Sequence, residues 1–398
     1  MGARSTAEQA GRDSGTTRSA TAAAPSAPRA QIVAHTGLRG IAALLVVAYH
    51  QQFGDFYRLP FELSTSLFKR SYLMVDLFFI LSGFIISYVY RAEGSGMRTS
   101  VKSFLFARFA RIYPLHFVIS IYMLAFAFVS AGLLALVGHA YTPPDAKSLG
   151  QWALQLVLVQ AWIPGFEAWN IPSWSISAEM FAYALFPAII FLGDLRPRLV
   201  RAALLAVAVG FYIYDTATTG SLDIVAGLAP LRCIAGFAIG MLLYDCRALP
   251  ARAPDGLLSV AQLIAVGWIG WGLVHRESDP FVVPAFALIV AATWTDRGII
   301  ARLLSLRPFE RLGEISYSVY LAHVPVGMTV LFFWLRAESK LGLAPPLARA
   351  IWLVLVFASV LSVASLTYRY IEVPARKALT RRSRRAPAAP AASYAAAP

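Results

Sequence analysis

The sequence of 398 residues has little charge and few cysteines. Asp, Glu, Lys and Arg make up only 14% of the residues, whereas 58% are hydrophobic; an ordinary soluble domain has about a quarter charged residues. Cys233 and Cys246 lack the spacing of a metal site and lie in or beside one apolar segment, so we expect neither a disulfide nor a metal there. This composition predicts a membrane protein.

The chain also lacks the motifs of several common enzyme classes. It contains no glycine-rich phosphate loop, no EF-hand, no HExxH, no G-x-S-x-G and no long polar segment for a separate soluble domain. Both ends are rich in small residues and arginine and have no apolar core. We therefore expect a disordered cytoplasmic segment at 1–34, one transmembrane domain at 35–378 and a disordered cytoplasmic tail at 379–398.

The apolar residues are concentrated in blocks of about 17–25 residues, the length of a helix that crosses a bilayer. An additional block, 151–163, is too short to cross and is followed by Pro164 and Gly165. The sequence predicts an all-α, polytopic transmembrane bundle of about ten spanning helices, with a short non-spanning helix near 151–163. The ten predicted spans are 38–54, 73–90, 112–136, 174–193, 199–214, 222–244, 257–274, 281–296, 315–335 and 350–369.

The basic residues predict the orientation, because cytoplasmic loops carry an excess of Lys and Arg. With both termini in the cytoplasm and 151–163 not crossing, 26 of the 35 basic residues fall on the cytoplasmic side. If 151–163 did cross, the arginine-rich segment 297–311 would face outward. Since the net charge of +14 arises mostly from loops and ends, we expect no nucleic-acid partner.

Ionisable side chains within the predicted spans are functional candidates, because their burial in hydrocarbon is unfavourable unless they face a cavity or a partner. Arg39 and His50 are eleven residues apart, which puts them on one helix face and about 16 Å apart along its axis. Structural ion pairs would explain such residues as well, and a proton relay in a transporter stays open. Further candidates in other spans are Asp76, Glu179, Arg232 and His323.

Arg108 and Arg111 lie on adjacent turns of one predicted helix, close to its cytoplasmic end. With Arg39 they predict a cationic mouth that suits phosphate groups, because the planar guanidinium makes paired, charge-assisted hydrogen bonds. Ordinary anchoring by positive residues at the cytoplasmic side explains the same arginines.

Six segments resemble, in chain order, the motifs of the membrane acyltransferase-3 family. The Arg39–His50 spacing resembles the R-x10-H signature, and Ile176 and Ala178 are mild departures from the W-S-L-S-x-E segment. Together the segments extend over residues 36–377. The other five segments are VDLFFILSGFIIS (75–87), FARFARIYP (106–114), PSWSISAEMFAY (172–183), GEISYSVYLAHVPV (313–326) and YRYIEVPARK (368–377).

The resemblance implies an integral-membrane O-acyltransferase with ten helices in the bacterial inner (cytoplasmic) membrane. It implies transfer of an acyl group, most often acetyl, from cytoplasmic acyl-CoA to a hydroxyl of an extracytoplasmic or lipid-linked saccharide. Acceptors that are lipids or small molecules stay open, as does a flippase without acyl chemistry. The implied partners are acyl-CoA, the acceptor, membrane lipid and envelope-biosynthesis proteins, with no metal.

The resemblance and the residues together predict the following roles. His50 acts as general base or as a covalent acyl carrier, because imidazole exchanges a proton near neutral pH. Glu179 orients the acceptor near Trp174. The remaining predicted site residues are Asp76 and His323 in support of catalysis, Arg39, Arg108 and Arg111 for CoA phosphates, and Ser173, Trp174 and Arg232 for the acceptor.

Overall fold

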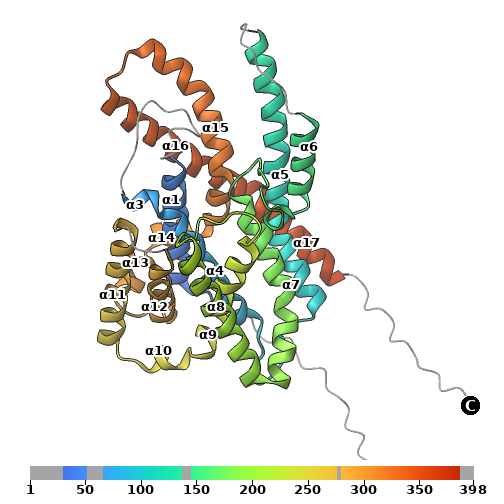
Figure 1. Cartoon of the computed structure of the whole chain (residues 1–398), viewed down its shortest axis with the longest axis vertical. Coiled ribbons are helices and arrows are strands. Elements are labelled where there is room, and N and C mark those ends of the chain that lie inside the picture. The colour runs from blue at the N-terminus through green and yellow to red at the C-terminus, as the bar shows by residue number, and fades with distance from the viewer. Residues whose placement is uncertain (1–29, 52–65, 137–144, 276–278, 386–398) are drawn as a thin grey trace, which may run out of the picture.

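The computed structural model describes residues 30–51, 66–136, 145–275 and 279–385, whose regular structure is entirely helical. Figure 1 shows α1 and α4 in the middle of the bundle, between α5–α7 on one side and α11–α13 on the other. In chain order the helices are α1 (Val33–His50), α3 (Ser66–Lys69), η1 (Ser71–Leu73), α4 (Met74–Tyr90), α5 (Val101–Leu136), α6 (Ala146–Leu156), η2 (Gln160–Trp162), α7 (Ser173–Leu195), α8 (Pro197–Thr218), α9 (Ala229–Asp245), α10 (Ala248–Arg252), α11 (Asp255–Val274), η3 (Asp279–Val282), α12 (Val283–Thr293), α13 (Ile299–Leu304), α14 (Arg307–Glu314), α15 (Ser316–Leu341), α16 (Pro345–Thr367), η4 (Tyr368–Glu372) and α17 (Val373–Arg385).

Eight helices in the described part of the chain are long and apolar enough to cross a membrane, which confirms the predicted polytopic all-α bundle. The other two predicted spans, 222–244 and 281–296, contain shorter helices: α9 has 17 residues and α12 has 11. A helix needs about 20 residues to cross the hydrocarbon core alone. Both short helices pack against α4 inside the bundle, where protein rather than lipid surrounds much of their surface.

Two further boundaries differ from the sequence prediction. Helix α5 has 36 residues and begins at Val101, eleven residues before the predicted span, so its first turns carry Arg108 and Arg111. The short helix expected near 151–163 is α6, which begins at Ala146 because the Asp145 side chain caps it by accepting the Ser148 N–H at 2.7 Å. Its 11 residues are too few to cross, as predicted.

Close packing of α4 on α9 depends on small residues. A Cβ atom on Gly240 would lie 2.1 Å from the main-chain oxygen of Ile80, and one on Gly83 would lie 2.0 Å from that of Phe237. Gly236 and Gly240 form a G-x-x-x-G pair on α9, a pattern that lets membrane helices approach closely. These small residues therefore allow α4 and α9 to pack closely against each other.

Helix α15 is tied to the start of α7 through a proline. Pro325 has no N–H, so the carbonyl of Leu321 loses its helical partner. The side-chain amide of Asn170 donates to this carbonyl at 3.0 Å. The bond fixes α7 relative to α15, and these two helices carry many of the predicted site residues.

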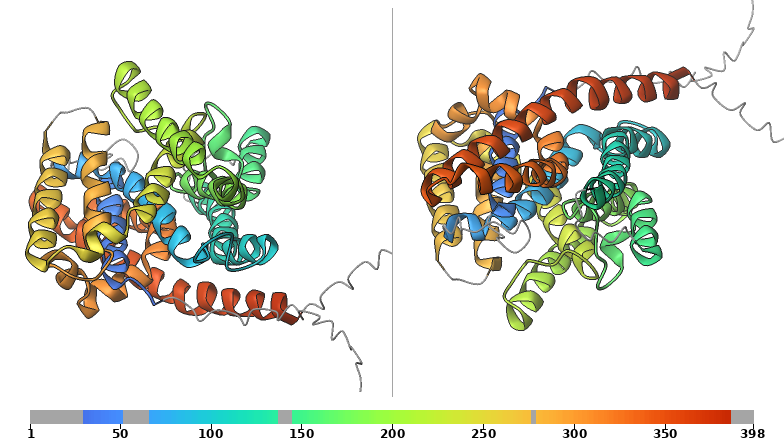
Figure 2. Two further views of the ribbon diagram at one scale, coloured as in Figure 1. Left: turned by 90° about the horizontal axis from the view of Figure 1, so that it is seen from below. Right: turned by 90° about the horizontal axis from the view of Figure 1, so that it is seen from above.

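The π-turn η4 joins α16 to α17, which packs along α5. Figure 2 shows α17 leaving the side of the bundle in both views. The segments 1–34 and 379–398, expected to be disordered, lie mostly outside the described residues. Within them the structure describes the start of α1 at Val33 and the last turns of α17 up to Arg385.

Candidate active site

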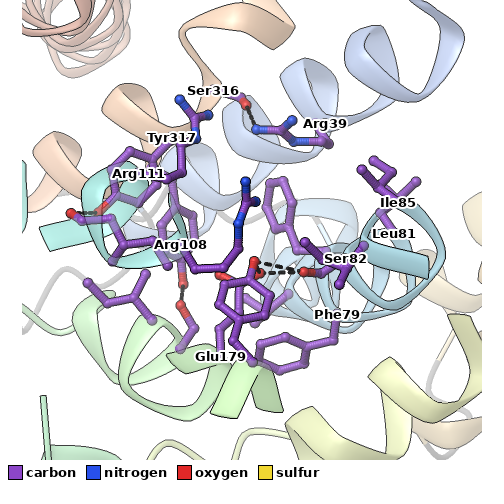
Figure 3. Close-up of a pocket in the computed structure, with 18 residues that line it drawn as sticks. Arg39, Phe79, Leu81, Ser82, Ile85, Arg108, Arg111, Glu179, Ser316 and Tyr317 are labelled. Carbon is purple, nitrogen blue, oxygen red and sulfur yellow. Dashed lines mark hydrogen bonds between the residues drawn. The ribbon is translucent and has the colours of Figure 1, made fainter. Parts of the chain in front are cut away.

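The three arginines predicted to bind phosphate line one cavity of about 140 Å³, which we call the arginine cavity. Arg39 comes from α1, and Arg108 and Arg111 come from α5 (Figure 3). Arg39 donates to Ser316 Oγ at 3.1 Å, and Arg108 donates to the Tyr90 hydroxyl at 2.8 Å. Helices distant in sequence thus bring the predicted cationic cluster together.

Glu179 of α7 also lines the arginine cavity (Figure 3). The hydroxyls of Ser82 and Tyr183 each donate to its Oε1 at 2.6 Å. Among the described residues no side chain or main-chain group donates to Oε2, so this oxygen is available to a ligand. Trp174 lies five residues earlier in α7 and lines a different cavity. The structure therefore does not bring Glu179 and Trp174 together in one cavity, and their roles toward the acceptor stay predictions.

A second cavity of about 350 Å³, the mouth, lies beside the arginine cavity. Arg39, Ile85 and Arg111 line both spaces, so the two are adjacent. Arg376, near the start of α17, adds a third guanidinium group to the mouth. Sequence reasoning missed Arg376, although it lies in a segment that carries the family resemblance.

The arginines of these two cavities differ in their pairing. Arg111 forms an ion pair with Glu372, whose side chain is 1% exposed and also accepts from the Ser318 hydroxyl at 3.0 Å. Arg39, Arg108 and Arg376 have no ion-pair partner among the described residues. This part of the bundle is therefore strongly cationic, with one arginine neutralised in place and three able to meet an anion.

The two predicted histidines form a dyad between α1 and α15. His323 Nδ1–H donates to the main-chain oxygen of Tyr320 at 2.7 Å, which leaves Nε2 of the neutral ring as an acceptor. His50 Nδ1–H donates to that Nε2 at 3.1 Å and to the Val46 carbonyl at 3.0 Å. From this hydrogen-bond network we assign the proton of the neutral His50 ring to Nδ1 and its lone pair to Nε2. No described residue is hydrogen-bonded to His50 Nε2.

His50 lines a third cavity of about 540 Å³, which we call the histidine cavity. His323 lines neither this cavity nor the arginine cavity, so it contacts His50 from behind. Other groups on the wall are the rings of Tyr49, Tyr72 and Trp174 and the carboxylate of Asp223, whose Oδ2 accepts from the Tyr49 hydroxyl at 3.2 Å. An aromatic wall with a carboxylate and an imidazole suits a polyhydroxyl ligand.

The arginine cavity and the histidine cavity meet at Val75 and Tyr320, which line both. Both side chains are buried, and the Tyr320 ring packs edge-on against Phe78 with centroids 5.7 Å apart. Through shared lining residues the mouth, the arginine cavity and the histidine cavity therefore follow one another across the bundle.

Asp76 and Arg232 form a fully buried ion pair between α4 and α9. Arg232 Nε and Nη2 donate to the two carboxylate oxygens at 3.1 and 2.6 Å, and the guanidinium lies 5.1 Å from the centroid of the Trp174 ring. Arg232 lines the histidine cavity, but Asp76 lines none of the three cavities. The sequence left open whether these residues bridge helices, and the structure has that bridge.

Ser173, a predicted acceptor contact, lines none of the three cavities either. Its Oγ and main-chain oxygen accept from the Gln160 amide at 3.1 and 2.8 Å, and its side chain is buried. The described residues hold no group of three His, Cys, Asp or Glu side chains that could bind a metal ion.

Comparison with known proteins connects this geometry to a family. A family model described as an acyltransferase domain, that of the acyltransferase-3 family, matches residues 33–369. The chain belongs to this family. It is a membrane O-acyltransferase, and several residues of the resembling segments, among them Arg39, His50 and Glu179, line the three cavities. No solved structure matches the chain.

Several curated relatives share most of the chain. Acyltransferase MdmB of Streptomyces mycarofaciens is 30% identical, over 73% of this chain and 78% of its own. Peptidoglycan O-acetyltransferase OatA of Listeria monocytogenes is 25% identical, over 86% of this chain, which spans only 55% of OatA. Exopolysaccharide production protein ExoZ of Rhizobium meliloti is 27% identical, over 72% of this chain and 83% of its own.

Other residues of the candidate site also escaped the sequence reasoning. Ser82 and Tyr183 hold Glu179, and Asp223 lies at the histidine cavity. Ser82 and Tyr183 are part of quoted motifs, but an uncharged hydroxyl in a span carries little signal by itself. Asp223 lies at the edge of a predicted span, where acidic residues are common and do not indicate a function.

Proposed function

We propose that this acyltransferase moves an acyl group, most often acetyl, from cytoplasmic acyl-CoA to a hydroxyl of an extracytoplasmic or lipid-linked saccharide. The observation that carries the proposal is the succession of three cavities that share lining residues, from a cationic mouth to a histidine with an available nitrogen. The donor enters at one end of this path and the acceptor at the other.

The mouth supports a polyanionic donor. CoA carries several phosphate charges, and Arg39 and Arg376 are guanidinium groups without a carboxylate partner among the described residues. In this account the phosphates stay in the mouth while the pantetheine arm extends into the arginine cavity. The available Oε2 of Glu179 accepts from a pantetheine amide N–H there, so Glu179 aligns the donor.

His50 carries the chemistry. Its Nε2 takes the proton of the acceptor hydroxyl as the oxygen attacks the thioester carbon, and a new C–O bond forms. When the tetrahedral intermediate collapses, the C–S bond breaks and the imidazolium returns the proton to the departing thiolate. His323 holds the His50 ring in the required tautomer, as the orienting member of a triad does.

The histidine cavity supports a saccharide acceptor. Trp174, Tyr49 and Tyr72 offer ring faces for the apolar side of a sugar, and Asp223 can accept from its hydroxyls. The names of the relatives OatA and ExoZ refer to peptidoglycan and exopolysaccharide, which favours an envelope glycan here. Proteins of envelope biosynthesis that present the glycan are the expected partners.

The orientation follows from the basic residues. The mouth lies where α1 begins, α4 ends and α17 begins, beside the basic segments that we assign to the cytoplasm. We therefore assign both termini to the cytoplasmic side of a bacterial inner membrane, with the histidine cavity toward the outer leaflet.

The experiment is mass spectrometry of envelope glycans and lipids from cells with and without the protein. The proposal predicts that a glycan carries an added acyl group, which for acetyl raises its mass by about 42 Da. This added mass should disappear when the gene is deleted and return with the wild-type chain. His50→Ala at equal membrane abundance should not restore it. A glycan that moves or disappears without any acyl change would instead indicate a transporter or flippase.

A further inference from the structure

We propose that the hydroxyl of Tyr320 is the hydrogen-bond donor that stabilises the oxyanion during acyl transfer. The inference rests on the proposed function and adds a catalytic residue to it. In the sequence, Tyr320 has neither a charge nor an unusual spacing that would indicate a function. Its position between the two cavities in the structure is what makes it a candidate.

The location of the reacting carbon leads to Tyr320. The thioester sulfur belongs to a donor held on the arginine side, and the attacking hydroxyl must lie within reach of His50 on the other side. The carbonyl carbon between them is therefore at the boundary of the two cavities. Of the two residues that line both, Val75 is aliphatic and Tyr320 alone carries an O–H group.

The contacts of the phenol place it at this boundary. Its oxygen lies 2.8 Å from Ser175 Oγ and 3.2 Å from the main-chain oxygen of Pro172. Ser175 lines the arginine cavity, whereas Pro172 lines the histidine cavity. Because Ser175 itself donates to the Pro172 oxygen at 3.0 Å, the phenol shares that acceptor with a second hydroxyl.

The chemistry needs such a donor. As the C–O bond forms, the π electrons of the carbonyl move to its oxygen, while the proton of the acceptor hydroxyl goes to His50 Nε2. A developing negative charge is a stronger acceptor than the neutral oxygens that now hold the phenol. The phenol proton can therefore turn to the oxyanion, and it turns back when the C=O bond re-forms and the thiolate leaves.

The main chain of the same residue fixes the histidines. The Tyr320 carbonyl accepts from His323, whose other nitrogen accepts from His50. The proposed oxyanion donor and the general base are thus held by one turn of α15. This arrangement keeps the phenol and the His50 imidazole at a fixed distance and orientation, and electrostatic stabilisation of a transition state requires such preorganised groups.

The test is Tyr320→Phe, which removes only the hydroxyl and keeps the ring against Phe78 and the carbonyl for His323. Membrane vesicles are prepared from native cells whose own gene has been deleted and which express one variant each. The transfer of label from [14C]acetyl-CoA to the endogenous acceptors in these vesicles is then measured. We expect the maximal rate per protein to fall by about 10²–10³-fold, the loss typical of an oxyanion-hole donor. KM for acetyl-CoA should stay within about threefold of the wild-type value, since binding of acetyl-CoA in the ground state does not use the Tyr320 hydroxyl.

Two matched variants separate catalysis from structure. Tyr212→Phe removes a buried hydroxyl that has no partner among the described residues and lies outside the three cavities, so it should leave the rate unchanged. Ser175→Ala removes the same Ser175–Tyr320 bond but keeps the phenol, so its loss of rate should be smaller than that of Tyr320→Phe. Equal loss in Ser175→Ala and Tyr320→Phe would overturn the assignment.

The outcomes also separate this inference from the proposed function. If wild-type vesicles transfer label and Tyr320→Phe transfers it at the same rate, the role of Tyr320 is overturned while acyl transfer stands. If wild-type vesicles transfer no more label than vesicles without the protein, the proposed function itself is overturned.

Discussion

His323 Nε2 lies 3.1 Å from His50 Nδ1, although 273 residues separate the two side chains in the sequence. The contact joins α1 to α15, and His323 is in turn held by the carbonyl of Tyr320. Of the two, only His50 lines one of the three described cavities, which gives the two histidines different surroundings. In our account the inner ring orients and the outer ring reacts.

We predict that His323→Ala lowers kcat by about 10–100-fold. The variant lacks the ring nitrogen that accepts the hydrogen bond from His50, so the His50 ring is no longer held in one tautomer and orientation. KM for acetyl-CoA should not change, since His323 lines neither the arginine cavity nor the mouth. His323→Gln should recover part of the rate, because its side-chain oxygen can accept from His50. Steady-state kinetics of both variants check this, and a raised KM at unchanged kcat would contradict the orienting role.

Arg376→Ala should raise KM for acetyl-CoA about tenfold, equivalent to the loss of one charge-assisted hydrogen bond of about 1.4 kcal/mol. Acetyl-pantetheine has no phosphates, so KM for this donor should be the same in the variant and the wild type. Lys377→Ala is the matched control, because Lys377 is exposed and lines no described cavity. A similar effect on both donors would remove Arg376 from phosphate binding.

Asp76→Asn should destabilise the fold, because it leaves Arg232 as an unpaired charge among fully buried groups. Removal of one partner of a buried pair typically costs about 3–5 kcal/mol. Thermal unfolding in detergent should therefore begin at a lower temperature, and Asp76→Asn combined with Arg232→Gln should unfold closer to the wild type. If Asp76→Asn unfolds like the wild type but has lost its kcat, Asp76 takes part in the chemistry after all.

Gly240→Ala should also lower the unfolding temperature and the yield of folded protein. The added methyl would lie 2.1 Å from the main-chain oxygen of Ile80, so α4 and α9 must separate. Gly267→Ala in α11 adds the same methyl where no heavy atom lies within 4 Å. Equal unfolding temperatures for the two variants would show that the α4–α9 approach is not needed.

Much of the fold could be predicted from the sequence because hydrocarbon imposes a simple rule on helix length. The rule failed at α9 and α12, which are shorter than a span. Both are packed against α4, where neighbouring helices replace lipid, and hydropathy does not reveal which segments have this position. The predicted span 112–136 left out the first turns of α5 for a related reason: these turns carry charge and extend beyond the apolar block.

The candidate site was predictable where an ionisable group is costly to bury. His50, His323 and the three arginines stood out for this reason, and the structure brings them into two groups. The separation of Glu179 from Trp174 could not be predicted, because residues five apart on one helix lie about 7.5 Å apart along its axis and can face different cavities. Tyr320 and Ser82 are neutral hydroxyl residues, and only tertiary contacts reveal them.

The most direct test of the account measures two products of one reaction in vesicles supplied with [14C]acetyl-CoA: free CoA thiol and labelled acetyl ester on envelope material. The account predicts that wild-type protein forms the two in equal amounts and that His50→Ala, present at the same level and equally stable, forms neither. Labelled ester formed by His50→Ala at the wild-type rate would contradict the central claim that the thioester is brought through the arginine cavity to this imidazole.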